Sequence, residues 1–223
     1  MRENVNTYNG LRVFIDNFVN ENTIVAEVGS FQGESSVMFA AKAKKVYCID
    51  PWDGEDAGNY GGAHIAISEV EKTFNEATKD FQNIEKIKKL SDDAAADFED
   101  NSIDFLYIDG MHTEEQVRKD IFNFFPKVKP DGIIGGHDLN YSIWGGVSKA
   151  VREILGEPHL VFPDTSWAFQ KKYFAKSTLP SSTERFAEAM ENFHVVYEGG
   201  TPFIIKWNVD EKGNQYDYRK EGA

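Results

Sequence analysis

The chain has 223 residues, with 37 acidic and 24 basic side chains and a formal net charge of -13 at pH 7. This excess of negative charge disfavours proteins that hold nucleic acid or anionic lipid by charge, because those partners need clustered lysine and arginine. Hydrophobic residues make up 41% of the chain. They are interrupted so often that no run reaches the roughly 18 apolar residues of a membrane helix. We therefore expect one compact domain with a modest extension, and neither a nucleic-acid nor a membrane partner.

The chain contains a single cysteine, Cys48, which cannot form an internal disulfide. Its first ten residues lack the charged and then apolar pattern of a secretory leader. Both observations favour a reducing compartment, so we expect the protein to be cytoplasmic.

Short apolar runs, rich in β-branched and aromatic residues, alternate with segments of helical periodicity. The predicted strands are residues 23–28, 46–49, 84–90, 103–108, 132–136 and a stretch around 167–173. The predicted helices are residues 10–20, 34–43, 65–81, 114–125 and 147–155. This alternation predicts an α/β fold, a Rossmann-like doubly wound and mostly parallel sheet with helices on both faces.

Two segments stand apart from this alternation. Residues 51–64 contain four glycines and three acidic residues after position 52, which favours a lid-like loop from which His64 could reach a substrate. Residues 176–223 are predicted to form a C-terminal extension packed on the main domain (1–175). In the extension we expect a loop and a helix over 176–192 and two strands around a Gly-Gly turn over 195–207. These two strands either cap the core or meet a second subunit, which would make a homo-oligomer.

The turn after the first predicted strand suggests a nucleoside site. Gly29 and Gly33 allow a sharp turn and close approach to a ligand, although such a pair alone also fits a plain strand-to-helix turn. Phe31 occupies the place of the second glycine of a dinucleotide fingerprint, which disfavours NAD. Asp50 ends the next strand, where an acid can accept hydrogen bonds from both ribose hydroxyls. Together these features favour a nucleoside over a plain turn.

Acidic and histidine side chains end two further strands. Asp109 and His112 follow one strand, and His137 and Asp138 follow the next. Two carboxylates at neighbouring strand ends can bind a hard divalent ion, whereas each acid alone also fits a helix cap or a loop. His112 titrates in the range where it can take a proton from an alcohol, and the alternative is a structural histidine. We interpret His159 and His194 as structural.

The motifs E-x-G-x-x-x-G-x-S, I-D-P-W, I-D-G-x-H and G-G-H-D resemble those of class I S-adenosylmethionine-dependent methyltransferases. Within that class the chain is similar to methyltransferase family 24 and to the metal-dependent sugar and catechol O-methyltransferases. The resemblance implies cofactor binding by Glu27, Gly29, Ser30, Gly33, Ser35, Asp50, Trp52, Asp92 and Asp109. It implies Asp109, His137 and Asp138 as ligands of Mg²⁺ or another divalent metal. It also implies His112, as general base, and Asp109 as the catalytic residues.

Three positions depart from the family pattern. Ser91 replaces a glycine before Asp92, and His137 replaces an acid, which would favour a softer ion than magnesium. Asp131 replaces the first glycine of K-P-G-G, where we expect it to adopt glycine-like backbone angles.

The resemblance predicts methyl transfer from S-adenosylmethionine to a hydroxyl of a small molecule or sugar, assisted by a divalent metal. The alternatives are an NAD(P)-dependent oxidoreductase and a metal-dependent hydrolase that uses Asp109, His112, His137 and Asp138. A catalytically inactive nucleoside-binding module is a further alternative.

Overall fold

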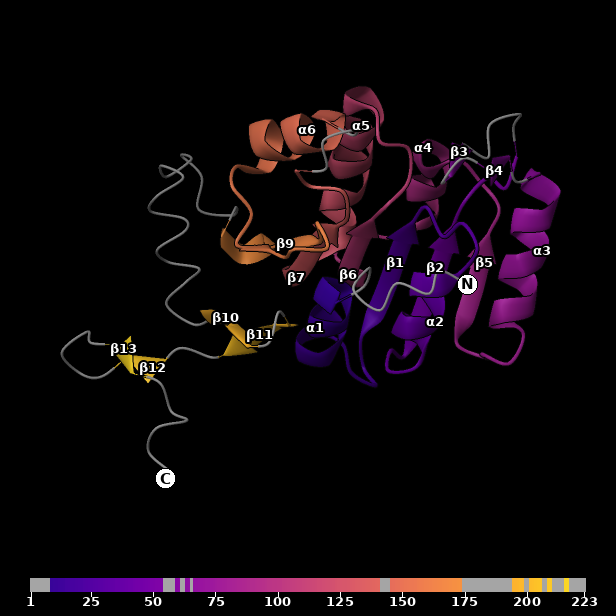
Figure 1. Cartoon of the computed structure of the whole chain (residues 1–223). Coiled ribbons are helices and arrows are strands. Elements are labelled where there is room, and N and C mark those ends of the chain that lie inside the picture. The colour runs from indigo at the N-terminus through magenta and orange to yellow at the C-terminus, as the bar shows by residue number, and fades with distance from the viewer. Residues whose placement is uncertain are drawn as a thin grey trace.

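A computed structural model describes residues 9–53, 59–60, 63–64, 66–140, 145–173, 194–198, 201–205, 208–209 and 215–216 (Figure 1). The helices are α1 (Asn9–Phe18), α2 (Glu34–Ala40), α3 (Ile67–Thr78), α4 (Ser91–Ala94), α5 (Glu114–Phe124) and α6 (Gly145–Leu155). The longer strands are β1 (Ile24–Val28), β2 (Lys45–Ile49), β5 (Ile84–Ile87), β6 (Ile103–Ile108), β7 (Val128–Gly136), β9 (Trp167–Gln170), β10 (His194–Glu198) and β11 (Thr201–Ile205). Two-residue strands are β3 (Asn59–Tyr60), β4 (Ala63–His64), β8 (Leu160–Val161), β12 (Asn208–Val209) and β13 (Gln215–Tyr216).

Seven strands form one sheet in the order β5-β2-β1-β6-β7-β9-β8. The first five are parallel, and β9 runs antiparallel to both of its neighbours. The central strands β1 and β6 are almost entirely buried, as expected for parallel strands that are covered on both faces. The predicted fold class is therefore confirmed.

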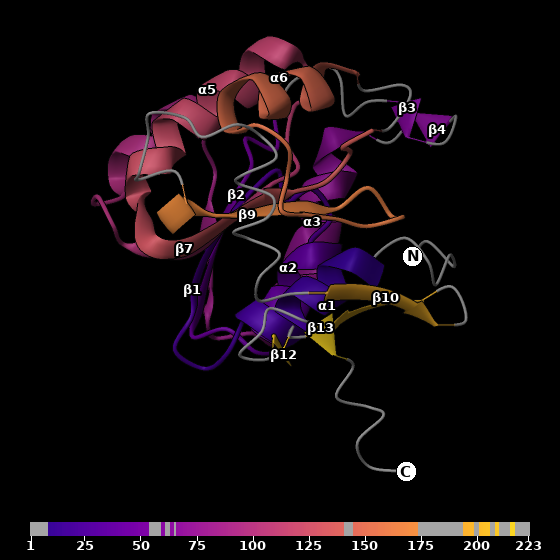
Figure 2. The ribbon, with the colours of Figure 1, turned by 90° about the vertical axis from the view of Figure 1, so that its left-hand side faces the viewer.

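Helices cover both faces of this sheet. The helices α4, α5 and α6 pack on one face through residues such as Val117, Ile121 and Val151. The helices α1, α2 and α3 pack on the other through residues such as Phe14 and Phe39. Figure 2 shows α5 and α6 on one side of the sheet and α1 and α2 on the other. None of the helices in the described part of the chain has the length and apolar character needed to cross a membrane.

Several element bounds differ from those expected. The strand β7 begins at Val128 instead of residue 132, and its pairing with β6 shifts register before Phe105. Asp131 therefore lies inside a strand, where it has no positive φ. The expectation of glycine-like angles there is wrong, because the irregular pairing at this point removes the tight turn. The predicted strand around 167–173 ends at Gln170, and Lys171–Tyr173 form a 3₁₀ helix.

The C-terminal strands β10 and β11 pair antiparallel around residues 199–200, which confirms the expected two-stranded segment. The loop and helix expected over residues 176–192 lie outside the described residues. Within the lid-like loop, β3 and β4 pair antiparallel, whereas residues 54–58 and 61–62 lie outside the described part.

Candidate active site

The predicted site residues gather at one edge of the sheet. Because β1, β2, β6 and β7 are parallel, their carboxyl ends share this edge, where open α/β sheets bind ligands. The loop between β1 and α2, Asp50 after β2, Asp109 after β6, and His137 and Asp138 after β7 all lie here.

The glycines of the β1–α2 loop are required by its path. Gly29 has a φ of 91°, and a Cβ at this position would lie 2.2 Å from the carbonyl oxygen of Asp109. Gly33 has a φ of 85°, and its Cβ would lie 3.0 Å from a ring carbon of Phe74. The loop after β1 therefore passes directly against the end of β6, and only glycine allows that approach.

Replacing Gly29 with alanine is expected to lower the free energy of unfolding by on the order of 3 kcal/mol, because the substitution adds both a clash and a strained φ. The matched control is Gly145→Ala in the first turn of α6, where a Cβ would meet no described atom within 4 Å. This control should stabilise the protein by up to about 1 kcal/mol. Urea denaturation of both variants measures the difference, and equal stabilities would contradict the close approach at Gly29.

Glu27 lies behind this loop and is fully buried. Its carboxylate accepts hydrogen bonds from the hydroxyls of Ser30, Ser35 and Ser36. Burial raises the pKa of Glu27, and the three serine hydroxyls partly offset this effect. The acid thus ties the loop to the start of α2. Direct contact of the Glu27, Ser30 and Ser35 side chains with a cofactor stays a prediction. Sequence reasoning missed Ser36. Its only signal in the sequence is its position directly after Ser35 at the start of α2.

Asp50 connects β2 to the β1–α2 loop. One carboxylate oxygen accepts the amide of Phe31 at 3.0 Å, and the other accepts the amide of Trp52 at 2.8 Å. Burial raises the pKa of Asp50, and these backbone amides oppose the rise. A carboxylate has about four acceptor positions, so Asp50 retains capacity for ribose hydroxyls.

Trp52 is a core residue in this conformation. Its side chain is buried against Phe74, with ring centroids 4.5 Å apart, and Lys86 lies over the indole. Its indole Nε1 donates to the carbonyl oxygen of Phe31 at 2.8 Å. Stacking of this ring on an adenine stays a prediction and would require it to leave part of this packing.

Asp92 is exposed at the start of α4 and accepts hydrogen bonds from Gln116 and Asn123 of α5. Beside it, the buried Asp120 accepts from Ser91 at 2.5 Å and from Gln116 at 3.0 Å. These bonds fasten α4 to α5 near the carboxyl end of β5. An adenine contact by Asp92 stays a prediction.

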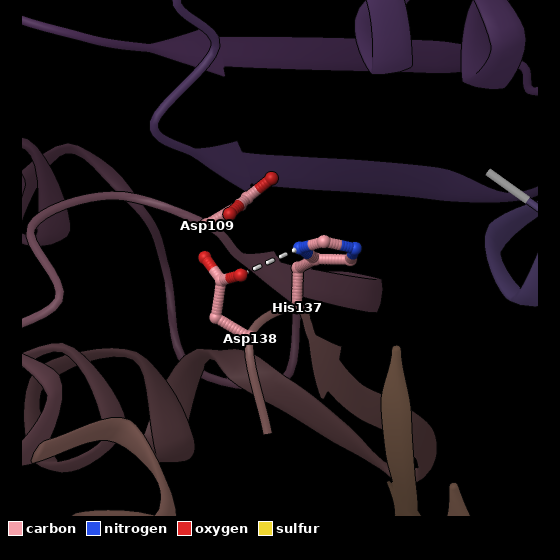
Figure 3. Close-up of side chains that lie close together, drawn as sticks. All are labelled: Asp109, His137 and Asp138. Atoms are coloured by element: carbon pink, nitrogen blue, oxygen red, sulfur yellow. Dashed lines mark ion pairs between the residues drawn. The ribbon is translucent and has the colours of Figure 1, made fainter. Parts of the chain in front are cut away.

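Asp109, His112, His137 and Asp138 form a compact cluster. Nε2 of His112 lies 2.7 Å from Asp138 Oδ2 and 3.5 Å from Asp109 Oδ1. Nδ1 of His137 lies 3.2 Å from Asp138 Oδ1. Figure 3 shows Asp109, His137 and Asp138 side by side at the ends of β6 and β7. The structure thus brings the predicted base and the predicted metal ligands together.

The backbone at this cluster is unusual. Asp138 has a φ of 60°, and Thr165, in the turn between β8 and β9, has a φ of 71°. Non-glycine residues in this region cost on the order of 1–3 kcal/mol each and occur preferentially at functional sites. The amide of Asp138 donates to Thr165 Oγ1 at 3.1 Å. Sequence reasoning missed Thr165, because no motif marks this short turn.

The two acids and two histidines of the cluster shift one another's pKa values. Burial disfavours the charged form of His112, but the hydrogen bonds and charges of Asp109 and Asp138 outweigh it and raise its pKa to about 9. Burial likewise opposes charging of His137, but the Asp138 carboxylate and the charge of Asp109 raise its pKa to about 9. Burial would raise the pKa of Asp138, yet hydrogen bonds from both histidines hold it well below its usual range.

These shifts predict how the stability of the cation-free protein depends on pH. The two histidines have folded pKa values of about 9, above the ordinary histidine pKa of about 6.5, so their contribution to stability is present below pH 6.5 and lost as pH rises toward 9. The contribution of Asp138 is present above its unfolded pKa of about 3.9 and is lost in acid. Between pH 6.5 and 9 we expect the free energy of unfolding to fall by on the order of 3 kcal/mol. The effects of the two histidines do not simply add, because both share the carboxylate of Asp138.

Urea denaturation in EDTA across this pH range measures the effect. The matched variant is Asp138→Asn, which keeps the shape of the side chain but removes its charge. Its profile should be flatter than that of the wild type, and parallel profiles would contradict the assignment to this cluster.

The donor set of the cluster fits a divalent cation. The ligand atoms of Asp109, His137 and Asp138 all lie within 4.8 Å of one another. Two ligands that bind one ion at about 2.1 Å are at most about 4.2 Å apart, so small side-chain movements would complete a site. Carboxylate oxygens with one imidazole suit ions such as manganese, iron or zinc.

A seven-stranded sheet of this order, with an acid at the end of β2 and the glycine-containing turn after β1, is the arrangement of the class I S-adenosylmethionine-dependent methyltransferases. Comparison with known proteins agrees. Residues 26–139, about half of the chain, match the family described as a methyltransferase domain, and the chain belongs to this family. Membership of this family favours a methyltransferase domain over the oxidoreductase and hydrolase alternatives, whereas the catalytically inactive nucleoside-binding module is not tested by it.

The individual relatives have low sequence identity to this chain. An uncharacterized protein, y4gI from Sinorhizobium fredii, is 26% identical over 190 residues, which cover 78% of this chain. The chain spans about a fifth of that protein, since the match covers 20% of its length.

Three solved structures share the fold. The O-methyltransferase NovP is 17% identical, with a TM-score of 0.52 over 74% of this chain and 78% of NovP. An rRNA methylase from Streptococcus thermophilus is 14% identical, with a TM-score of 0.50 over 71% of this chain and 91% of the methylase. A spermidine synthase from Thermotoga maritima is 17% identical, with a TM-score of 0.50 over 74% of this chain and 60% of the synthase. The names of these proteins indicate different acceptors, so the shared fold does not define the acceptor.

Proposed function

We propose that the protein transfers the methyl group of S-adenosylmethionine to a hydroxyl oxygen of a small molecule or sugar. Asp109, His137 and Asp138 would hold a divalent cation, and His112 would act as general base. The observation that supports this assignment best is the position of His112 Nε2, 2.7 Å from Asp138 and 3.5 Å from Asp109. A base next to the ligands of a cation is the arrangement needed to deprotonate a coordinated alcohol.

The donor would lie over the β1–α2 loop. Gly29 and Gly33 leave the backbone of this loop open to close approach, and Asp50 has acceptor positions left for ribose hydroxyls. Because Gly29 lies directly against Asp109, a sulfonium methyl held at this loop would be close to the histidine-aspartate cluster. This proximity supplies the alignment that an in-line displacement requires.

The reaction needs one proton to leave the acceptor. The hydroxyl gives its proton to His112 Nε2, its oxygen forms a bond to the methyl carbon, and the carbon–sulfur electron pair returns to sulfur to give S-adenosylhomocysteine. A bound divalent cation would supply Lewis acidity and orient the acceptor oxygen. Asp109 and Asp138 favour the charged form of His112 while they are free. Once these carboxylates serve as ligands, that stabilisation is lost, and the imidazole is available to accept a proton.

Charge favours certain acceptors. The net charge of -13 and the three acids between residues 53 and 56 suit an uncharged polyhydroxylated or cationic molecule better than a polyanion. Histidine in place of a third acid suits a cation softer than magnesium, such as manganese. We place the reaction in the cytoplasm, where the single buried thiol of Cys48 stays reduced.

A methyl-transfer assay tests the proposal. Purified protein is incubated with methyl-labelled S-adenosylmethionine and vicinal diols, sugars or catechols, with Mn²⁺, with Mg²⁺ or with EDTA. We expect a labelled methyl ether with a cation, and no product in EDTA. The matched control for each acceptor is its mono-methyl ether. Transfer to amines alone, or product formation that is unaffected by EDTA, would contradict an oxygen-directed, cation-assisted reaction.

A further inference from the structure

Thr165 occupies a turn position that is unfavourable for threonine. Residues 162–166 connect β8 to β9, and the amide of Phe162 donates to the carbonyl oxygen of Ser166 at 2.9 Å, which leaves a three-residue loop, 163–165. Thr165 ends this loop, and its amide donates to the carbonyl oxygen of Phe162 at 2.9 Å. Hairpin loops of this length place their last residue in the left-handed region, which glycine adopts most easily. Thr165 adopts it with a φ of 71°, although its side chain is β-branched. A strained residue at the edge of the active site suggests a function for its side chain.

The contacts of Thr165 are with the residues that follow β7. Its Oγ1 accepts the amide of Asp138 at 3.1 Å and lies 3.5 Å from Nε2 of His137. Its carbonyl oxygen accepts the amide of Leu139 at 3.1 Å. One hydroxyl has two acceptor positions, so Oγ1 can accept from the Asp138 amide and from the His137 ring together.

The backbone of His137 is fixed independently of Thr165. Its amide donates to the carbonyl oxygen of Ile108 at 3.2 Å, and its own carbonyl oxygen accepts the indole of Trp167 at 3.0 Å. A Cβ on the preceding Gly136 would lie 2.3 Å from the Ile108 carbonyl oxygen, so this segment also packs closely against β6. The remaining freedom of His137 is the orientation of its ring, which Asp138 contacts at Nδ1 and Thr165 at Nε2.

The turn that carries Thr165 is itself anchored. Asp164 accepts the amide of Gly10 from α1 at 2.5 Å and the amide of Ser166 at 3.1 Å. A Cβ at Gly10 would lie 2.3 Å from Asp164, so the contact between α1 and the turn is close. A side chain on an anchored turn can hold a neighbouring group in one orientation.

We propose that Thr165 is a positioning residue that orients the His137 imidazole, so that Nδ1 faces Asp138 and is available to a cation, and that fixes the backbone of Asp138. The proposal rests on the cation-assisted function proposed above. A histidine that ligates a metal commonly donates its other ring N–H to a neighbouring acceptor, which fixes its orientation. Figure 3 shows Nδ1 of His137 directed at Asp138, which leaves Nε2 for Thr165.

The test compares Thr165→Val, which keeps the branched shape without the hydroxyl, with Thr165→Ser, which keeps the hydroxyl. Mn²⁺ affinity is measured by calorimetry. We expect Thr165→Val to bind Mn²⁺ about 10- to 100-fold more weakly and Thr165→Ser to bind nearly as the wild type does. The matched control is Thr78→Val on α3, which removes a buried threonine hydroxyl that donates to the backbone carbonyl of Phe74, and it should not change Mn²⁺ affinity.

Amide hydrogen exchange in EDTA provides a readout without metal. Loss of the Thr165 hydroxyl should speed exchange of the Asp138 amide about tenfold, because that amide loses its acceptor. If Thr165→Val does not fold, Thr165→Gly relieves the backbone strain, lacks the hydroxyl and should show the same changes.

The outcomes separate the two proposals. Wild-type affinity in Thr165→Val, or equal weakening in Thr165→Ser, would overturn the positioning role while the proposed function stands. Absence of Mn²⁺ binding by the wild type would overturn the cation-assisted function, and the exchange rate of the Asp138 amide would then decide whether Thr165 fixes this segment. Unchanged exchange in Thr165→Val would overturn that role as well.

Discussion

Replacing His112 with glutamine is expected to lower kcat by about 10²- to 10⁴-fold, which is the usual contribution of a general base. Glutamine preserves the approximate size and polarity of the side chain, but it cannot accept a proton from the hydroxyl of the acceptor. Because Nε2 of His112 lies beside Asp109 and Asp138, and the donor is proposed to lie over the β1–α2 loop, affinity for S-adenosylhomocysteine should stay near that of the wild type. Steady-state kinetics and calorimetry measure the two effects separately.

The matched control for this variant is His159→Gln. His159 is buried, and its Nδ1 accepts the amide of Gln170, the last residue of β9, outside the cluster. Its kcat should stay close to that of the wild type once the protein is shown to be folded. A similar fall in kcat in both variants would indicate a structural effect and contradict the role of His112 as base.

The second large effect is expected at Asp50 and Asp138, which lie at the ends of different strands. Asp50 is proposed to bind the methyl donor, and Asp138 is proposed to bind the cation. Asp138→Asn should weaken Mn²⁺ binding by about 100-fold or more and abolish cation-dependent turnover, since it removes a charged ligand that also contacts both histidines. Asp50→Asn should weaken S-adenosylhomocysteine binding about 10- to 100-fold, because hydrogen bonds to a charged carboxylate are lost or weakened. Each variant should retain the affinity that the other one loses.

Calorimetry with each ligand on both variants measures this separation, and thermal unfolding shows whether both variants are folded. The two substitutions are matched, because each replaces a strand-end carboxylate with an amide of the same shape. Loss of both affinities in either folded variant would contradict separate donor and cation sites.

Much of the fold follows from local patterns. The strand over residues 103–108 has the predicted bounds, because a continuous apolar run between polar residues leaves little choice of ends. The two-residue strand β8 was not predicted, since so short a strand carries no periodic signal and depends on its pairing with β9. The early start of β7 depends on an irregular pairing with β6, which residues 128–132 do not reveal by themselves.

The candidate site was predictable where it depends on strand ends. Asp109, His137 and Asp138 were expected to meet, because adjacent parallel strands bring their carboxyl ends to one edge. The direct contact between His112 and Asp138 was not predicted, since it depends on how the two loops face each other. Thr165 lies far along the chain in a turn that contacts β7 only after β9 has paired with it, so no local pattern could have identified it.

The central claim, that this edge of the sheet binds a methyl donor, is tested most directly by calorimetric titration with S-adenosylhomocysteine. The titration is run with and without Mn²⁺, and NADH serves as the comparison ligand. We expect S-adenosylhomocysteine to bind with an affinity of about micromolar order in both conditions, as is typical of small-molecule sites, and NADH not to bind. Binding of NADH in place of S-adenosylhomocysteine, or of neither nucleoside, would contradict the methyl-donor site.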